Sequence, residues 1–276
     1  MKLSATLALL VVGLAGTLAA PTDAVAQPRG RAAKPPKAPR ACGVSAIPLA
    51  LGNEWTYEPV PPPPERALTE AQVRLTPIQP KRLVVKVTAI EAKNDGTHVT
   101  LTEDHDGRVH TTTLRCTAGG TFSVAPDAFW FAGEPGITYG IELANVERKG
   151  QTLNLAAGKL TGFEWWDDVK ATWKHVPTAK ATPRMHGGTL EIVRHFVVLP
   201  EEKLQLPIGE KAGEQLKAIK LGLETTVKVT LDPAPPQPLK APPMLVNFFW
   251  FVDGMGPVQV LNSYGQQYVL TRLVSN

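Results

Sequence analysis

The stretch THVTLTEDHDGRVHTTTLRC, residues 97–116, decides the fold class. It contains two runs of alternating polar and apolar residues on either side of an Asp-Gly step at 106–107. Asp-Gly is typical of a β-hairpin turn, because glycine adopts a positive φ at no steric cost. The stretch therefore predicts two antiparallel strands, 97–103 and 108–116, joined by a turn at 104–107.

This predicted pairing places four residues on one face of the hairpin. Side chains alternate between the two faces of a strand, so odd residues of the first strand lie beside even residues of the second. Val99 and Leu101 then share a face with Leu114 and Cys116. We expect this face to point into the core.

Similar patterns recur along most of the chain. They predict further strands at 55–58, 82–90, 188–199, 216–231, 248–252, 258–261 and 268–273. With 26 prolines and 23 glycines in 276 residues, long helices cannot dominate the fold. The Pro-rich stretches 59–80 and 232–243 are predicted to be loops, whereas residues 210–221 fit a strand and a helix equally well. The predicted fold class is mainly β, in a single domain over residues 42–276.

Residues 1–26 have the features of a cleaved signal peptide. A basic residue at position 2 precedes an apolar run over 3–18, and the small residues AVA at 24–26 suit signal peptidase. An uncleaved membrane anchor is the alternative, but the run is short for a span. We therefore expect a secreted or periplasmic protein with no transmembrane span after cleavage.

The next segment, QPRGRAAKPPKAPRA at 27–41, is a basic tail that carries five basic residues and no acidic one. Such a composition predicts a disordered spacer with polyproline character. It either contacts an anionic envelope surface or is a plain solvated linker. The net charge of +4 is concentrated in this tail, so nucleic acid is not an expected partner.

The chain has two cysteines, Cys42 and Cys116. An oxidising compartment favours a disulfide between them, and two free thiols are the alternative. The bridge would tie the start of the domain to the predicted strand 108–116. Cys42 lies too far beyond Ala26 to be the lipid-modified residue of a lipoprotein.

Two short motifs resemble a group of uncharacterised exported bacterial β-proteins. PLALGNEWTY at 48–57 is similar to their opening motif PLxxGNxWxY, and WFVDGMGPV at 250–258 is similar to their closing motif WFxxGxGPV. The resemblance implies a curved antiparallel sheet or half-barrel, similar to those of periplasmic lipoprotein carriers, with the two motifs near the two ends of the sheet. The lipoprotein cysteine of many such proteins is missing here, and the resemblance implies no catalytic residue.

Aromatic residues cluster in three places along the chain, and ordinary core packing explains most of them. A sharper hypothesis is that some line an apolar groove for a lipid-like ligand or a partner segment. The candidate groove residues are Trp130, Trp165, Trp166, Phe249, Trp250 and Phe251.

A hydrolase acting on envelope carbohydrate is the alternative function. Its candidate acids are Glu164, Asp167 and Asp168, and a glycosidase needs two carboxyls about 5 to 9.5 Å apart across a cleft. Asp167 and Asp168 would face opposite sides of a strand, whereas Glu164 and Asp168 could meet on one helical turn.

The sequence contains no common nucleophile, phosphate-loop or dinucleotide motif. The hairpin histidines His98, His105 and His110 are too widely spaced for one ion, so we expect no metal and no cofactor. The predicted function is a non-catalytic exported envelope protein that binds an apolar ligand or a protein partner.

Overall fold

The computed structural model describes residues 42, 46–61, 79–116, 121–124, 130, 141–150, 153–154, 161–175, 187–208, 213–232 and 244–276. The chain divides into two units, Met1–Pro36 and Lys37–Asn276, and every described residue belongs to the second. The predicted signal peptide and basic tail, residues 1–41, lie outside the described residues. Most of the predicted loops 59–80 and 232–243 also lie outside them.

The described residues form thirteen antiparallel strands in one sheet, which confirms the mainly β fold class. The strands are β1 (Glu54–Val60), β2 (Leu83–Lys93), β3 (Gly96–His105), β4 (Arg108–Cys116), β5 (Thr121–Val124), β6 (Ile141–Gly150), β7 (Leu153–Asn154), β8 (Glu164–His175), β9 (Gly187–Gln205), β10 (Gln215–Asp232), β11 (Leu245–Val252), β12 (Gly256–Leu261) and β13 (Gln267–Val274). Their order across the sheet is β6-β8-β9-β10-β11-β12-β13-β1-β2-β3-β4-β5-β7.

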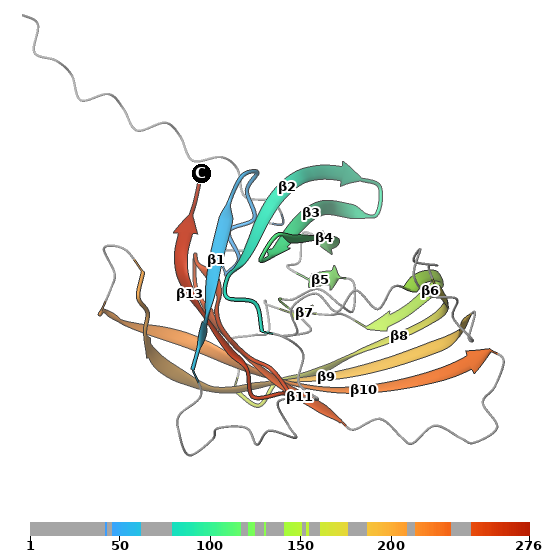
Figure 1. The fold of residues 1–276 in the computed structure, drawn as a ribbon. Helices are drawn as coiled ribbons and strands as arrows, with labels where there is room; N and C mark the ends of the chain where they lie inside the picture. The colour runs from blue at the N-terminus through green and yellow to red at the C-terminus, as the bar shows by residue number, and fades with distance from the viewer. Residues whose placement is uncertain are drawn as a thin grey trace, which may run out of the picture. The chain divides into compact units, whose positions relative to one another are not determined.

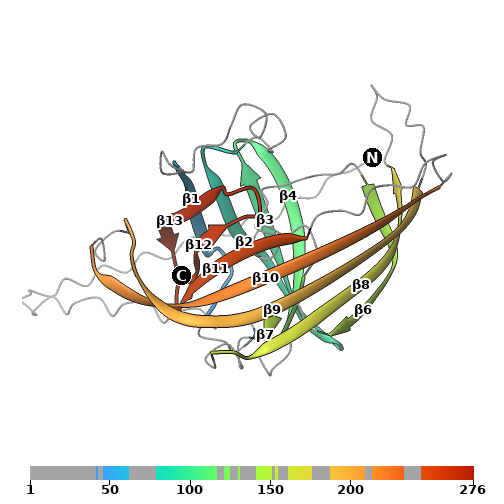
Figure 2. The ribbon, with the colours of Figure 1, turned by 90° about the horizontal axis from the view of Figure 1, so that it is seen from below.

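The chain enters this sheet in the middle and builds it outward on both sides. β1 to β5 extend toward one edge, whereas β8 to β13 return from the other edge until β13 pairs with β1. β6 and β7 end the order and do not pair with each other in the described part of the chain, so the sheet is open. The long strands β8, β9 and β10 have 12, 19 and 18 residues and curve beneath β1 to β5 in the view of Figure 1. Figure 2 shows the same three strands bending side by side.

One hydrophobic core joins the two parts of this curved sheet. Trp55, Val85 and Leu101 from β1 to β3 belong to the same buried cluster as Phe196 and Leu221 from β9 and β10. Below, the inner face is the side of the sheet that carries these residues, and the outer face is the opposite side.

The two sequence motifs meet at the centre of the sheet, which corrects the expectation that they lie near its two ends. β1 pairs with β13 from Glu54 opposite Val274 to Val60 opposite Gln267. Only β13 separates the opening motif on β1 from the part of the closing motif on β12, and the first and last strands are direct neighbours. We call this contact the seam.

Two buried side chains of the opening motif hydrogen-bond to the closing motif across the seam. Trp55 Nε1 donates to the carbonyl oxygen of Met255 at 2.6 Å, and the Tyr57 hydroxyl donates to that of Pro257 at 2.7 Å. Trp130 packs edge-on against Trp55, with ring centroids 4.8 Å apart, and donates from Nε1 to the Tyr57 hydroxyl at 3.0 Å. Burial raises the pKa of Tyr57 well above 10.0, so its hydroxyl keeps its proton.

The predicted hairpin is confirmed, with a shorter turn than expected. Val99 pairs with Leu114, and both are buried with Leu101 and Cys116 on the inner face. β3 continues to His105, so the turn is Asp106-Gly107 alone, with φ of 53° and 87°. Two consecutive positive φ values are what a two-residue type I′ turn requires.

One predicted element boundary is wrong, and one alternative that the sequence left open is resolved. β1 does not stop before Pro59 but continues through it to Val60, because β2 pairs with β1 only as far as Tyr57 and the missing N–H of Pro59 faces no such partner. Within 210–221, residues from Gln215 onward form a strand and not a helix. The pairing of β10 with β9 shifts by one residue between Ala218 and Lys220, where two β9 residues lie opposite Ile219, whereas its pairing with β11 is regular from Ile219 onward.

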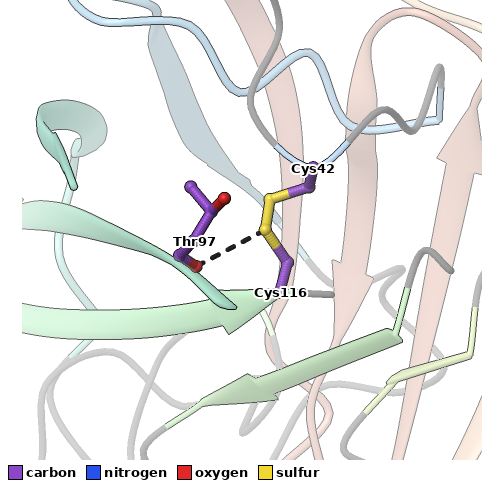
Figure 3. The surroundings of a disulfide bond; sticks show 3 residues. All are labelled: Cys42, Thr97 and Cys116. Atoms are coloured by element: carbon purple, nitrogen blue, oxygen red, sulfur yellow. Dashed lines mark hydrogen bonds between the residues drawn. A yellow bond between two sulfur atoms is a disulfide. The ribbon is translucent and has the colours of Figure 1, made fainter. Parts of the chain in front are cut away.

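The structure contains the predicted disulfide. Cys42 and Cys116 are bridged with their Cα atoms 5.6 Å apart, 74 residues apart in sequence (Figure 3). The Thr97 carbonyl oxygen lies 3.6 Å from Cys116 Sγ, and since a bridged sulfur carries no proton this approach is a contact without a hydrogen bond. The bridge fixes the residue that leads into the opening motif to the end of β4.

We expect Trp55→Phe to destabilise the fold by about 2 to 4 kcal/mol, because it leaves the Met255 carbonyl without its partner and a gap in the core. Urea unfolding monitored by circular dichroism measures this change. Trp166→Phe is the matched control, since Trp166 is exposed, and should change stability by no more than about 0.5 kcal/mol. Equal effects of the two substitutions would contradict the role of the seam.

Reduction of the disulfide should lower the stability of the wild-type protein by about 4 kcal/mol, because the bridge closes a long loop in the unfolded chain. Thermal unfolding with and without reductant gives the difference. The variant Cys42→Ala/Cys116→Ala should be insensitive to reductant. A wild-type protein equally stable in both conditions would show that the bridge does not constrain the unfolded chain.

Candidate functional site

The six predicted groove residues are divided between the two faces of the sheet. Trp165, Phe249 and Phe251 lie on the inner face within the core, and Trp130 is buried at the seam. Strand register places Trp250 and Trp166 on the outer face, where Trp166 is exposed and Trp250 is buried and still contacts the main core cluster. Consecutive aromatic residues on β8 and β11 therefore face opposite sides of the sheet, and the six residues do not line one common surface.

The inner-face aromatics pack against other parts of the core. Trp165 on β8 stacks on Phe196 of β9, its partner in register, with ring centroids 5.1 Å apart and planes within 4°. The ring of Phe163 also lies close to that of Trp165, with the two ring centroids 5.9 Å apart. These contacts explain the burial of Trp165 by ordinary side-chain packing.

On the outer face, Trp250 encloses a lysine of the same chain. Lys220 Nζ lies 4.9 Å from the ring centroid of Trp250 and 5.2 Å from that of Phe248. It also lies 2.7 Å from Glu202 Oε1, and Trp250 Nε1 donates to the other carboxylate oxygen at 2.7 Å. The bond from Lys220, and then that from Trp250, lowers the pKa of Glu202. We call these four residues the Lys220 cluster.

Trp166 is the exposed member of the predicted set, with 52% of its surface accessible. Its ring stacks on His195 of β9, with centroids 4.6 Å apart and planes within 10°. His195 Nε2 lies 3.1 Å from Glu164 Oε2, and its Nδ1 lies 3.5 Å from Glu224 Oε2. The imidazole is thus held between two carboxylates and under an indole.

Strand register explains this arrangement. Trp166, His195 and Glu224 are opposite one another on β8, β9 and β10, and alternation puts Glu164 and the exposed Val193 on the same outer face. We call Glu164, Trp166, Val193, His195 and Glu224 the Trp166 patch.

The candidate acids of a hydrolase are not brought together. Asp167 is fully buried on the inner face, where it pairs with Arg194 and lies 3.4 Å from Arg148 Nε. Glu164 and Asp168 lie on the outer face of β8, so the alternative of one helical turn is wrong. Four residues along a strand separate them by about 13 Å, which exceeds the spacing of a glycosidase pair.

The buried pair of Asp167 and Arg194 divides the inner face of the long strands. On one side lies the main core with Trp165 and Phe196, and on the other a smaller cluster of Val169, Leu190 and Ile192. Burial lowers the pKa of the neighbouring Arg148, an effect that the Asp167 carboxylate opposes. Such a pair fixes β8 against β9 at the cost of removing two charges from water.

We expect Arg194→Met to destabilise the protein by about 3 kcal/mol, because it leaves the Asp167 carboxylate buried without its nearest cation. The double variant Asp167→Leu/Arg194→Met should lose less than Arg194→Met alone, since no buried carboxylate then remains there. Urea unfolding of the three proteins measures both effects. A larger loss in the double variant would contradict this account.

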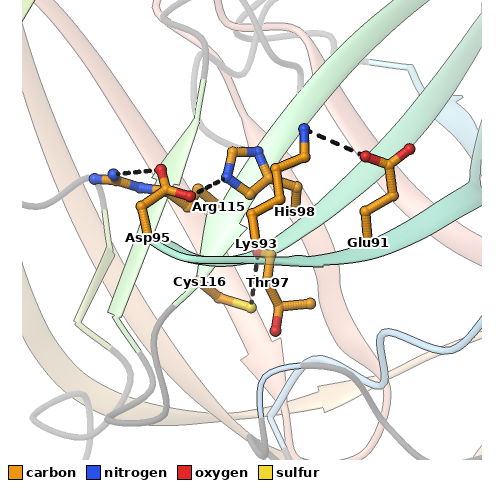
Figure 4. Close-up of polar contacts among 7 residues, drawn as sticks. All are labelled: Glu91, Lys93, Asp95, Thr97, His98, Arg115 and Cys116. Atoms are coloured by element: carbon orange, nitrogen blue, oxygen red, sulfur yellow. Dashed lines mark hydrogen bonds and ion pairs between the residues drawn. The ribbon is translucent and has the colours of Figure 1, made fainter.

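Two of the hairpin histidines, His98 and His105, contact separate carboxylates. His98 pairs with Asp95 at 2.9 Å, and Arg115 binds the same carboxylate at 3.1 Å (Figure 4). The hydrogen bonds from His98 and Arg115 lower the pKa of Asp95 to about 2. His105 is buried beside Glu103 at 3.3 Å. The described residues contain no group of three or more ligating side chains that could hold a metal ion.

Sequence reasoning missed Arg194, His195 and Glu224 as partners of the residues it selected. The alternating run EIVRHFVVL at 191–199 contains a usable signal, because it places Arg194 on the same face as Phe196. A buried arginine requires a carboxylate, but the identity of that carboxylate depends on the register of β8 against β9.

A search of the described residues for a long, apolar helix of membrane-spanning length finds none. No protein-family model matches the sequence, and no curated protein matches it.

Solved structures similar to this chain have low sequence identity to it. A candidate exported protein with a YmcC-like fold from Bacteroides fragilis is 16% identical over 83% of this chain and 98% of that chain, with a TM-score of 0.46. A candidate lipoprotein from Parabacteroides distasonis is 13% identical over 84% and 99%, with a TM-score of 0.49. The hypothetical lipoprotein YmcC from Escherichia coli is 14% identical over 84% and 89%, with a TM-score of 0.32. At these identities and TM-scores the similarity supports no functional assignment.

Proposed function

We propose that this chain is an exported, non-catalytic protein that binds a protein partner through the Trp166 patch. The observation that carries the proposal is the exposure of Trp166, which is 52% accessible on β8 and shares the outer face with Val193, which is 43% accessible. Tryptophan is enriched among the residues that dominate binding energy at protein interfaces, because its large ring loses much apolar surface to water on association.

The burial of the other aromatics favours a protein partner over an apolar ligand in a groove. Trp130, Trp165, Phe249, Trp250 and Phe251 are each packed against side chains of this chain. Trp166 is the residue of the predicted set whose ring is available at the surface. A surface tryptophan among charged side chains suits a partner that brings both apolar and polar groups.

The hydrolase alternative receives no support from the placement of its candidate acids. Asp167 is buried and neutralised by arginine, and Asp168 and Glu164 lie on the other face. The signal-like segment 1–26 supports export, and the five basic residues of 27–41 would favour contact with an anionic envelope surface.

A photoreactive residue at position 166 tests the proposal in cells that produce the protein. We expect a discrete crosslinked protein from position 166 and none from position 109, where Val109 is 64% accessible on β4. The crosslinked protein is then identified and purified. Its affinity for the Trp166→Ala variant should be about thirtyfold weaker than for the wild type, as for an interface hot spot.

Val109→Ala is the matched control and should bind the purified partner as the wild type does. Unchanged affinity of Trp166→Ala would overturn the proposal. A reproducible lipid-like mass in native mass spectrometry of the exported protein, with no crosslink at position 166, would instead support the apolar-ligand function.

A further inference from the structure

We propose that the Trp166 patch recognises a basic segment of its partner, with a lysine or arginine side chain placed against the part of the Trp166 ring that His195 leaves open, near Glu164 or Glu224. This inference rests on the proposed function, because it names the chemistry of the partner at the same patch. Three independent features of the outer face support it: the charge of the patch, a matching arrangement elsewhere on the same face, and the surroundings of the ring.

The patch carries more negative than positive charge. Glu164 and Glu224 both contact the same imidazole, at 3.1 and 3.5 Å. One imidazole carries at most a single positive charge, whereas two ionised carboxylates carry two negative ones. No lysine or arginine forms an ion pair with either glutamate among the described residues. A cationic group from a partner would therefore be attracted to the patch.

The lysines nearest to the patch are already placed beside other carboxylates. Lys170 and Lys228 both pair with Glu191, at 3.4 and 3.7 Å. Lys149 on β6 lies opposite Asp168 in register. Lys170, Lys228 and Lys149 are thus placed beside Glu191 and Asp168, and none of them forms an ion pair with Glu164 or Glu224 among the described residues.

The Lys220 cluster shows how this outer face binds a cation. There a tryptophan, a second ring and a glutamate surround Lys220 Nζ, which lies 4.9 Å from the Trp250 centroid and 2.7 Å from Glu202. The Trp166 patch offers the same elements, an indole and carboxylates, but the described chain supplies no lysine or arginine to it. A cation over an indole face is attracted by the negative charge of the ring face.

The surroundings of the Trp166 ring define how a basic side chain would approach. His195 occupies one face of the indole, at 4.6 Å between centroids, so the partner must use the other face or the ring edge. Val193 is exposed on the same face, two residues from His195 along β9, and can contact the methylene groups of a lysine or arginine. The charged end then lies near Glu164 or Glu224.

Fluorescence anisotropy with a labelled Gly-Ser peptide that contains four spaced arginines tests the inference on the mature protein. We expect the peptide to bind, and binding to weaken with added salt. The variant Glu164→Gln/Glu224→Gln keeps the shape of the patch and removes both charges, and should bind about tenfold more weakly. The same peptide with aspartate in place of arginine should not bind.

Glu91→Gln is the matched control, since Glu91 is an exposed acid on β2 that pairs with Lys93 at 3.3 Å, away from the patch. It should bind the arginine peptide as the wild type does. Urea unfolding of each variant verifies that the fold is kept. Equal affinity of the double variant and the wild type would overturn the inference, because the peptide would then bind elsewhere.

The two proposals fail in distinguishable ways. If the crosslinked partner depends on Trp166 but the arginine peptide does not bind, the basic chemistry is wrong and the proposed function stands. If neither the partner nor the peptide depends on Trp166, both are wrong. Binding of the purified partner that weakens in Glu164→Gln/Glu224→Gln as well as in Trp166→Ala supports both.

Discussion

The pairing of the first strand with the last is the interaction on which the rest of the sheet depends. Trp55 and Tyr57 each reach across 200 residues of sequence to a carbonyl of the closing motif, so the two ends of the domain are joined at its centre. From this seam the remaining strands extend in two directions, and both directions contribute side chains to one core. The disulfide adds a covalent link from Cys42, just before the opening motif, to the end of β4.

Side chains alternate between the two faces along the long strands, and this alternation determines which of them are buried and which are exposed. On β8, Trp165 and Asp167 point inward to Phe196 and Arg194, whereas Trp166 points outward to His195. A shift of one residue in this register would exchange the two faces and expose the buried charges. The inner contacts therefore hold β8 in the register that keeps Trp166 on the outer face.

The outer face repeats one chemical arrangement with two outcomes. At Trp250 the indole and a glutamate enclose Lys220 of the same chain, and the tryptophan is buried. At Trp166 an indole and two glutamates surround a histidine, and the tryptophan stays half exposed. The difference between a structural cluster and a candidate binding surface is thus whether the described chain itself provides the lysine.

The sequence by itself determined the β class, the hairpin around Asp106-Gly107 and the disulfide, because alternation, a positive-φ turn and oxidation of two cysteines are local or compositional properties. It could not place the two motifs together, since the contacts of Trp55 with Met255 and of Tyr57 with Pro257 join residues 200 positions apart. It also left strand and helix open within residues 210–221, because the spacing of the apolar residues there fits both, and pairing with β9 and β11 makes the part from Gln215 onward a strand. Only the tertiary structure decided the partners of Trp166 and Asp167, because these depend on the register between strands that no local pattern specifies.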